Sequence, residues 1–381
     1  MKLNFDLLRL VMQCLGRPEL LHIMHTCHTL YELGVPLILR NVNYADFDHR
    51  CNNLYRHFLL PDPSRFVHVT RLDCYDLGIP TSLLRDFLRL STCIVDLRIH
   101  VSHESSVTLD DVGRIGRMSH LRHLRLLGPI PVLELFRSLT VPLVSLAICQ
   151  HSIPNLIPED NCVLRNPISS INRFSGTLEE FCFNLHSSTH LHVVFTTGYS
   201  FHSMRKFEWS TWHPIDIGAI VSTFPNLDSL SVRFYGVEDH SHHFRDSPLL
   251  SAEQMAVFRQ RSQETQQWDV YHCLRYLQGS VPSLWTLGIQ CQVELLDISV
   301  IHREIPLTHT RDLLASTRPP DLCLSFPSYG YRRGVLANLP GFIFAYETVQ
   351  KLELKLSVTQ YEIKMAADEL VRSIRSTQLL C

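Results

Sequence analysis

A short apolar pattern, L-x-x-L-x-L, recurs along most of the chain and constrains its fold more than any other feature. Within each copy apolar and polar residues alternate, which is typical of a β-strand with one buried face. Further copies lie at residues 284–289 and 349–354. The central residues of the first seven copies are 25, 27, 22, 35, 26 and 23 positions apart: Leu72, Leu97, Leu124, Leu146, Phe181, Phe207 and Leu230.

Helical patterns lie between these predicted strands. Residues 83–88, 132–136 and 217–221 are short and mostly apolar, and Thr108 with Asp111 has the spacing of a capping box. A strand followed by a helix at a constant period predicts a stack in which each unit covers the apolar face of the next. We therefore expect an α/β fold, a curved right-handed solenoid with parallel strands.

The repeat length resembles that of leucine-rich repeats, whose period is roughly 20–29 residues. The asparagine that usually follows each strand of that family is mostly missing, so we expect irregular repeats over residues 43–358. Two insertions, 151–173 and 236–280, interrupt the rhythm. Within the second, residues 236–250 read as a polar loop and 251–278 as one helix.

The end of the chain is expected to close the solenoid. Residues 316–334 are rich in Pro, Tyr and Arg and read as a loop. Residues 352–356 read as the last strand. A helix over residues 362–374 would then cap the exposed end, so residues 359–381 form a capping segment.

The first 42 residues have a different, helical pattern. Apolar residues spaced for one helical face begin at Leu3, and Gly16 is suited to the left-handed position that ends a helix. Pro18 is suited to the first turn of a second helix, and Pro36 to that of a short third one. So small a segment cannot bury its apolar faces alone, so it must pack on another protein or on the rest of the chain.

This segment resembles an F-box. The resemblance is carried by residues 3–8, Val11, Leu15, residues 18–21, Thr26, Cys27, Leu30, Tyr31, Leu33 and Pro36. Asn4 and Leu30 stand where the family usually has Pro and Trp. Asn4 can still cap the first helix, and Leu30 is still a large apolar side chain. The chain as a whole is similar to fungal F-box proteins with irregular repeats.

The F-box resemblance implies that the first helices bind another protein. Proteins of this family bind the adaptor subunit of an SCF-type (cullin-RING) ubiquitin ligase, and the rest of the chain holds a substrate protein near the ligase. On this resemblance the chain is a substrate receptor without catalytic residues or cofactors. The residues expected to contact the adaptor are Leu3, Asn4, Leu7, Leu8, Val11, Leu15, Pro18, Leu20, Leu21, Cys27, Leu30 and Tyr31.

Two alternatives stay open. The helices of residues 1–42 could cap the core of the following domain in a repeat scaffold that never joins a cullin. The chain could also be an enzyme of an unrecognised kind. Against the second alternative, the sequence has no G-x-S-x-G, G-x-x-x-x-G-K, G-x-G-x-x-G or H-E-x-x-H motif.

Composition excludes several partners. The formal charge of −2 over 381 residues gives no reason to expect nucleic acid as a partner. Twelve cysteines include no C-x-x-C pair, and no apolar run reaches the roughly eighteen residues of a membrane helix. We expect a cytoplasmic or nuclear protein that contacts no membrane. The cluster of His240, His242 and His243 could bind a metal ion, but a solvated loop is the preferred interpretation, so no metal site is predicted.

The outward residues of the strands are candidates for substrate binding. In a solenoid they line the face where such proteins often bind their partners. Arg98, His100, His123 and Arg125 lie on neighbouring repeats and could bind an acidic or phosphorylated segment, because arginine forks match such anions. The alternative is a charged strand surface exposed to water, which is common in proteins.

Overall fold

The structure is a computed structural model of the 381-residue chain. It forms two compact units, residues 1–161 and 162–381. The parts of the chain that the structure describes are residues 4–43, 59, 61–75, 81–101, 107–128, 132–150, 166–185, 198–235, 250–266, 273–299, 307–326 and 348–356.

The first unit begins with three helices, α1 (Phe5–Gln13), α2 (Arg17–Met24) and α3 (His28–Leu39). Asn4 caps α1 as predicted, because its side chain accepts a hydrogen bond from the backbone N–H of Asp6 at 2.9 Å. Two boundaries were predicted wrongly. Gly16 has a φ of −66° and begins α2 instead of ending α1, and Pro36 lies inside α3. The helix continues through Pro36 because its buried residues hold it in place by tertiary packing.

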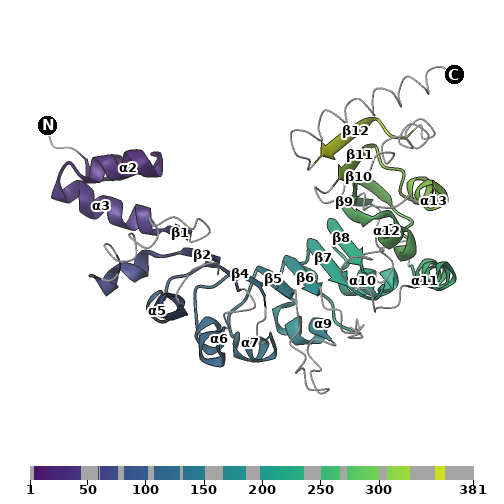
Figure 1. Cartoon of the computed structure of the whole chain (residues 1–381), viewed down its shortest axis with the longest axis horizontal. Helices are drawn as coiled ribbons and strands as arrows, with labels where there is room; N and C mark the ends of the chain where they lie inside the picture. Colours follow the sequence, from purple (N-terminus) through teal and green to yellow (C-terminus); the bar gives the residue numbers. More distant parts are fainter. Residues whose placement is uncertain are drawn as a thin grey trace. The chain divides into compact units, whose positions relative to one another are not determined.

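Parallel strands follow in the first unit, each paired with the next along the sequence. They are β1 (Asn41–Asn43), β2 (Arg71–Tyr75), β3 (Asp96–His100), β4 (His123–Leu127) and β5 (Ser145–Gln150). One face of these strands is covered by helices (Figure 1). These are the 3-10 helix η2 (Pro63–His68), α5 (Thr81–Leu90), α6 (Leu109–Gly116) and α7 (Val132–Ser138). The predicted helices of this unit are therefore confirmed.

Register explains why the leucine pattern predicts the core. Leu72, Leu97, Leu124 and Leu146 are aligned on successive strands. Each is at most 2% exposed and points toward the helices. The leucine positions three residues earlier in each copy are buried as well, so one repeat covers the next.

Gly128 follows β4 at a point where two chain segments come very close. Its φ is +114°, and its N–H donates to the carbonyl oxygen of Cys149 at 2.8 Å. A Cβ atom at this position would overlap the carbonyl oxygen of Val101. Only glycine fits both the backbone conformation and the space.

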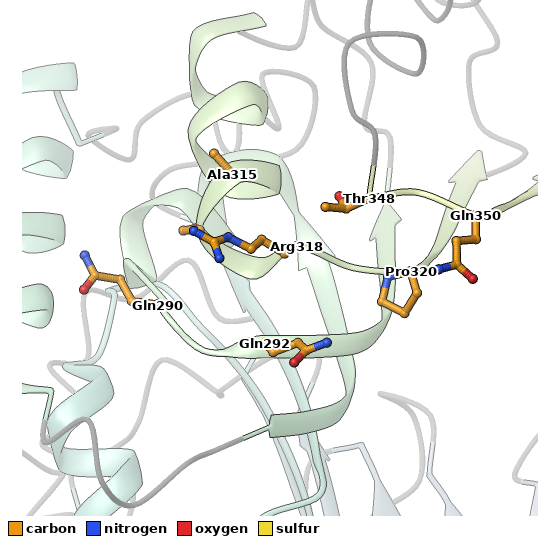
Figure 2. A pocket seen from close by; sticks show the side chains of 8 residues that line it. Gln290, Gln292, Ala315, Arg318, Pro320, Thr348 and Gln350 are labelled. Carbon is orange, nitrogen blue, oxygen red and sulfur yellow. The ribbon is translucent and has the colours of Figure 1, made fainter.

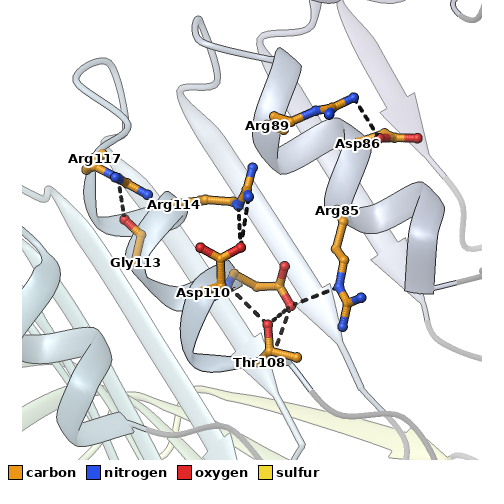
Figure 3. A network of polar contacts seen from close by, with 9 residues as sticks. Arg85, Asp86, Arg89, Thr108, Asp110, Gly113, Arg114 and Arg117 are labelled. Carbon is orange, nitrogen blue, oxygen red and sulfur yellow. Dashed lines mark hydrogen bonds and ion pairs between the residues drawn. The ribbon is translucent and has the colours of Figure 1, made fainter.

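A polar network joins α5 and α6 (Figure 3). Thr108 and Asp111 form the predicted capping box at the start of α6. Arg85 of α5 lies 3.8 Å from the same carboxylate, measured from its Nε to Oδ2 of Asp111. Asp110 binds Arg114 at 2.8 Å along α6. These contacts fix the helix ends, while the exposed ion pairs add little stability of their own.

The second unit also consists of parallel strands paired in sequence order. The strands are β6 (Glu180–Leu185), β7 (Lys206–Thr211), β8 (Ser229–Phe234), β9 (Cys273–Ser280), β10 (Gln292–Ser299), β11 (Asp321–Phe326) and β12 (Lys351–Leu356). The helices are α9 (Pro167–Ile171), η3 (Asn172–Phe174), α10 (Ile217–Thr223), α11 (Ala252–Thr265), α12 (Val281–Leu287) and α13 (Leu307–Thr317). In Figure 1, α10 to α13 cover one face of the strands β7 to β11.

Three predictions for the second unit are wrong. The helix predicted over residues 251–278 ends at Thr265, and the last part of that range is β9. Residues 284–289, predicted as a strand, belong largely to α12, because Ser280 caps this helix by accepting from the N–H of Ser283 at 3.2 Å. The loop predicted at 316–334 contains the end of α13 and all of β11, whose Leu322 and Leu324 are buried.

Other predictions fall partly or wholly outside the described residues. These are most of the excursion at 151–173, the polar loop at 236–249 with its histidines, and the capping segment at 359–381. The strand predicted at 352–356 is confirmed as β12. The mixed α/β class with parallel strands is also confirmed. The right-handed solenoid winding and the F-box nature of the first helices stay predictions.

Candidate functional site

Helix α1 presents an apolar surface to solvent. Leu7, Leu10 and Val11 have the i, i+3, i+4 spacing of one helical face, and they are 60%, 57% and 55% exposed. Phe5 is also 58% exposed at the start of the helix, but it lies seven residues before Met12 and therefore on another side of the helix from Leu7. Met12, roughly on the opposite face, is only 1% exposed. We call Leu7, Leu10 and Val11 the α1 apolar surface.

The inner face of α1 is held by close packing with α2 and α3. Met12 and Met24 meet over Gly34, where a Cβ atom would overlap the side chain of Met24 and come within 3.2 Å of Met12. Leu20 of α2 is also buried, at 5% exposure. The helices thus pack against one another without using the α1 apolar surface.

The residues predicted to contact the adaptor have very different exposures. Leu7 and Val11 belong to the α1 apolar surface, and Asn4, Pro18 and Cys27 are exposed. Leu20 is buried, and Leu3 lies outside the described residues. The half-buried members of the predicted set are Leu8, Leu15, Leu21, Leu30 and Tyr31.

Sequence reasoning missed one residue of this surface, Leu10. Leu10 follows Leu7 by three positions, so helical spacing alone could have included it. Tyr31, which was predicted, is engaged inside the unit. It accepts a hydrogen bond from Arg65 of η2 at 3.1 Å.

A second candidate surface is the face of β2 to β4 that lies opposite the helices α5 to α7. Here Asp73, Arg98 and Arg125 are aligned on successive strands, and so are Arg71, Asp96 and His123. Asp96 lies between two arginines, 3.4 Å from Nε of Arg71 and 3.3 Å from Nε of Arg98.

The four residues predicted to bind substrate therefore differ in their surroundings. Arg98 is held by Asp96, and the ring of His100 lies edge-on to Tyr75 with the ring centres 5.4 Å apart. His123 and Arg125 are exposed on β4. Burial raises the pKa of Asp73, while the charges of Arg98, Arg71 and Arg125 lower it.

The corresponding face of the second unit carries a buried carboxylate. Asp297 of β10 is 2% exposed and accepts hydrogen bonds from Tyr276 at 2.9 Å and Ser325 at 2.8 Å. Lys355 of β12 donates to it at 3.4 Å. Burial and the bond to Asp297 raise the pKa of the Tyr276 hydroxyl, which is therefore a donor at neutral pH. Every partner comes from a different strand, so the cluster ties β9, β10, β11 and β12 together.

An open pocket of about 720 Å³ lies in the second unit at the ends of α13, β10, β11 and β12 (Figure 2). Its only charged lining residue is Arg318, which has a φ of 44°. None of the lining residues is a Cys, His, Asp or Glu, the residue types that most often act as bases. The lining consists of Gln290, Gln292, Ala315, Ser316, Arg318, Pro320, Thr348 and Gln350.

Three helices of the second unit meet in a stack of rings and a guanidinium. The rings of Trp285 and His309 are 3.8 Å apart and nearly parallel, and Arg259 lies over Trp285 at 4.8 Å. Asp312 accepts from the indole N–H at 3.2 Å. Burial lowers the pKa of His309; Arg259 acts in the same direction and Asp312 opposes it.

This stack predicts an acid-sensitive second unit. The pKa of His309 is lower in the folded chain than its ordinary value of 6.5, so the unfolded chain takes up this proton first. The contribution of the neutral His309 side chain to the stability of the fold is complete above pH 6.5. It is lost as the pH falls toward the folded-state pKa of this group. Thermal unfolding between pH 7.5 and 5.5 should show a smaller loss of Tm for His309→Gln than for the wild type. Equal losses of Tm in the two proteins would show that His309 does not cause the acid sensitivity.

Among the residues described by the structure, no group of three or more Cys, His, Asp or Glu side chains is placed to hold a metal ion. The cluster of His240, His242 and His243, for which a solvated loop was predicted in preference to a metal site, lies outside those residues. Within the same described ranges, no helix combines the length and the apolar character needed to cross a bilayer.

Comparison with known proteins adds no assignment: no family model matches the chain, and no curated protein matches it.

Proposed function

We propose that the chain is a substrate receptor of an SCF-type ubiquitin ligase. In this proposal the first three helices bind the adaptor, and through it a cullin, while the strands of the repeats bind a substrate protein. The chain would supply no catalytic group. It would act by raising the effective concentration of substrate lysines near the ubiquitin-charged enzyme. Such a subunit works in the cytoplasm or nucleus.

The α1 apolar surface is the observation that carries the proposal. A soluble protein rarely exposes several large apolar side chains side by side, and such patches are typical of protein-binding sites. The surface belongs to the segment that resembles an F-box, and it is left over after α1 has packed on α3. Burial of each of its leucines would contribute about 1.5–3 kcal/mol to binding.

Aspartate at both Leu7 and Leu10 is expected to abolish adaptor binding. Loss of two buried leucines should weaken binding by more than about a hundredfold, and the charges would add a desolvation cost. The measurement is recovery of the adaptor subunit when it is co-expressed with the full chain. Both side chains are exposed, so the thermal unfolding of the variant should stay close to that of the wild type.

Leu109→Asp is the matched control. Leu109 is 62% exposed at the start of α6 and lies outside the F-box-like segment. This variant should recover as much adaptor as the wild type. If the wild-type chain recovers no adaptor, the proposal is wrong, and the repeat scaffold that never joins a cullin becomes the better interpretation. Equal recovery by the wild type and the Leu7, Leu10 variant would also contradict it.

A further inference from the structure

Among the described residues of β2 to β4, the strand face opposite helices α5 to α7 carries one more arginine than it carries carboxylates. Three arginines, Arg71, Arg98 and Arg125, face two carboxylates, Asp73 and Asp96. Asp96 lies within 3.4 Å of both Arg71 and Arg98. Asp73 is buried and lies beside Arg98 in the register. The excess charge therefore resides at Arg125.

Arg125 makes no hydrogen bond or ion pair with a described residue, and it acts on Asp73 only through its charge. It stands directly beside Arg98, on strands roughly 4.8 Å apart. Like charges placed opposite each other across two strands repel, and an anion bound at Arg125 would reduce that repulsion. The unliganded face thus has an electrostatic reason to take up an anion.

Arg125 also has a second donor and free space next to it. His123 precedes it by two residues on β4, so both side chains leave the same face of the strand. On the other side, β5 places Ser145 beside His123 and Ala147 beside Arg125. These small side chains leave room for the backbone of a bound segment.

We propose that this face binds a phosphorylated segment of a substrate protein, with the phosphate held by Arg125 and His123. A phosphoserine carries close to two negative charges on three oxygens, which suits an arginine fork and a neighbouring imidazole better than one carboxylate does. Arg98 stays bound to Asp96 and attracts the phosphate only through its positive charge. The identification of the ligand as a substrate rests on the proposed function, whereas the binding itself does not.

The test measures retention of the full-length chain on immobilised peptide pools of random sequence. One pool is centred on phosphoserine, and two matched pools carry serine or glutamate instead. The wild type should bind the phosphoserine pool at least about tenfold more tightly than either of the others. Arg125→Gln should remove that preference. Arg117→Gln, which takes the same charge from an exposed position at the end of α6, should keep it.

Several results would overturn the inference. Equal retention on the serine and phosphoserine pools would exclude phosphate recognition. Equal retention on the glutamate and phosphoserine pools would mean that any acidic segment suffices. Equal losses for Arg125→Gln and Arg117→Gln would mean that only the overall charge matters. Adaptor recovery by the same preparations is independent of these results, so its failure would refute the proposed function and leave phosphoserine binding to be judged by itself.

Discussion

Gly128→Ala is expected to destabilise the first unit by about 3 kcal/mol or more. An alanine at φ +114° is strained, and its Cβ would overlap the carbonyl oxygen of Val101. Val101 cannot retreat freely, because its own N–H donates to Leu127 at 2.7 Å. Movement of the backbone to relieve this overlap would therefore separate the ends of β3, β4 and β5, which meet at this point.

Hydrogen exchange with mass spectrometry can localise this effect. Peptides from β3 to β5 should lose protection in the Gly128→Ala variant, whereas peptides from the second unit should change much less. Gly113→Ala is the control, because nothing lies within 4 Å of a Cβ at that position of α6. This control should be stabilised by about 0.5–1 kcal/mol, as expected for alanine in place of glycine within a helix. Unchanged protection at Gly128→Ala would contradict the explanation.

Asp297→Ala is expected to destabilise the second unit by about 2–4 kcal/mol. The variant leaves the hydroxyl groups of Tyr276 and Ser325 without their acceptor. Lys355 is half exposed and can turn toward water, so its charge adds less to the cost. Because the carboxylate links four strands, its loss should loosen β9 to β12 together.

All four tryptophans of the chain, at 209, 212, 268 and 285, lie in the second unit, so their fluorescence in urea reports on it. The control is Glu353→Ala, which removes an exposed carboxylate from β12 and should change stability by less than about 0.5 kcal/mol. Asp297→Asn can still accept some of the hydrogen bonds, so its unfolding midpoint should lie between those of Asp297→Ala and Glu353→Ala. An unfolding midpoint for Asp297→Ala equal to that of Glu353→Ala would show that the cluster is not stabilising.

Strands β2 to β5 of the first unit could be predicted because each copy of the apolar pattern buries the same positions. The pattern failed at residues 284–289 for a physical reason. Leu284 and Leu287 are three residues apart, which suits one face of a helix as well as the first half of L-x-x-L-x-L. The deciding features were local, namely the cap at Ser280, Pro282 in the first turn and Gly288 with a φ of 65°.

The candidate sites were predictable only in part. Alternation along β3 and β4 indicates that Arg98 and Arg125 point away from the core. It cannot show that Arg71 of β2 also lies beside Asp96, because that contact depends on how neighbouring strands are aligned. Likewise, the spacing of Leu7 and Val11 indicates an apolar helix, but only the packing of Met12 over Gly34 shows which side is left exposed.

The order of the strands has a consequence for how such a chain can change over evolutionary time. Neighbouring strands are neighbours in sequence, yet the connection between them varies widely: Leu72 pairs with Leu97, 25 residues on, whereas Leu230 pairs with Leu277, 47 residues on. The entropic cost of a longer connection grows only slowly with its length. Whole segments can therefore be gained or lost between two strands while their pairing is kept, so the ligand repertoire can diversify without redesign of the scaffold.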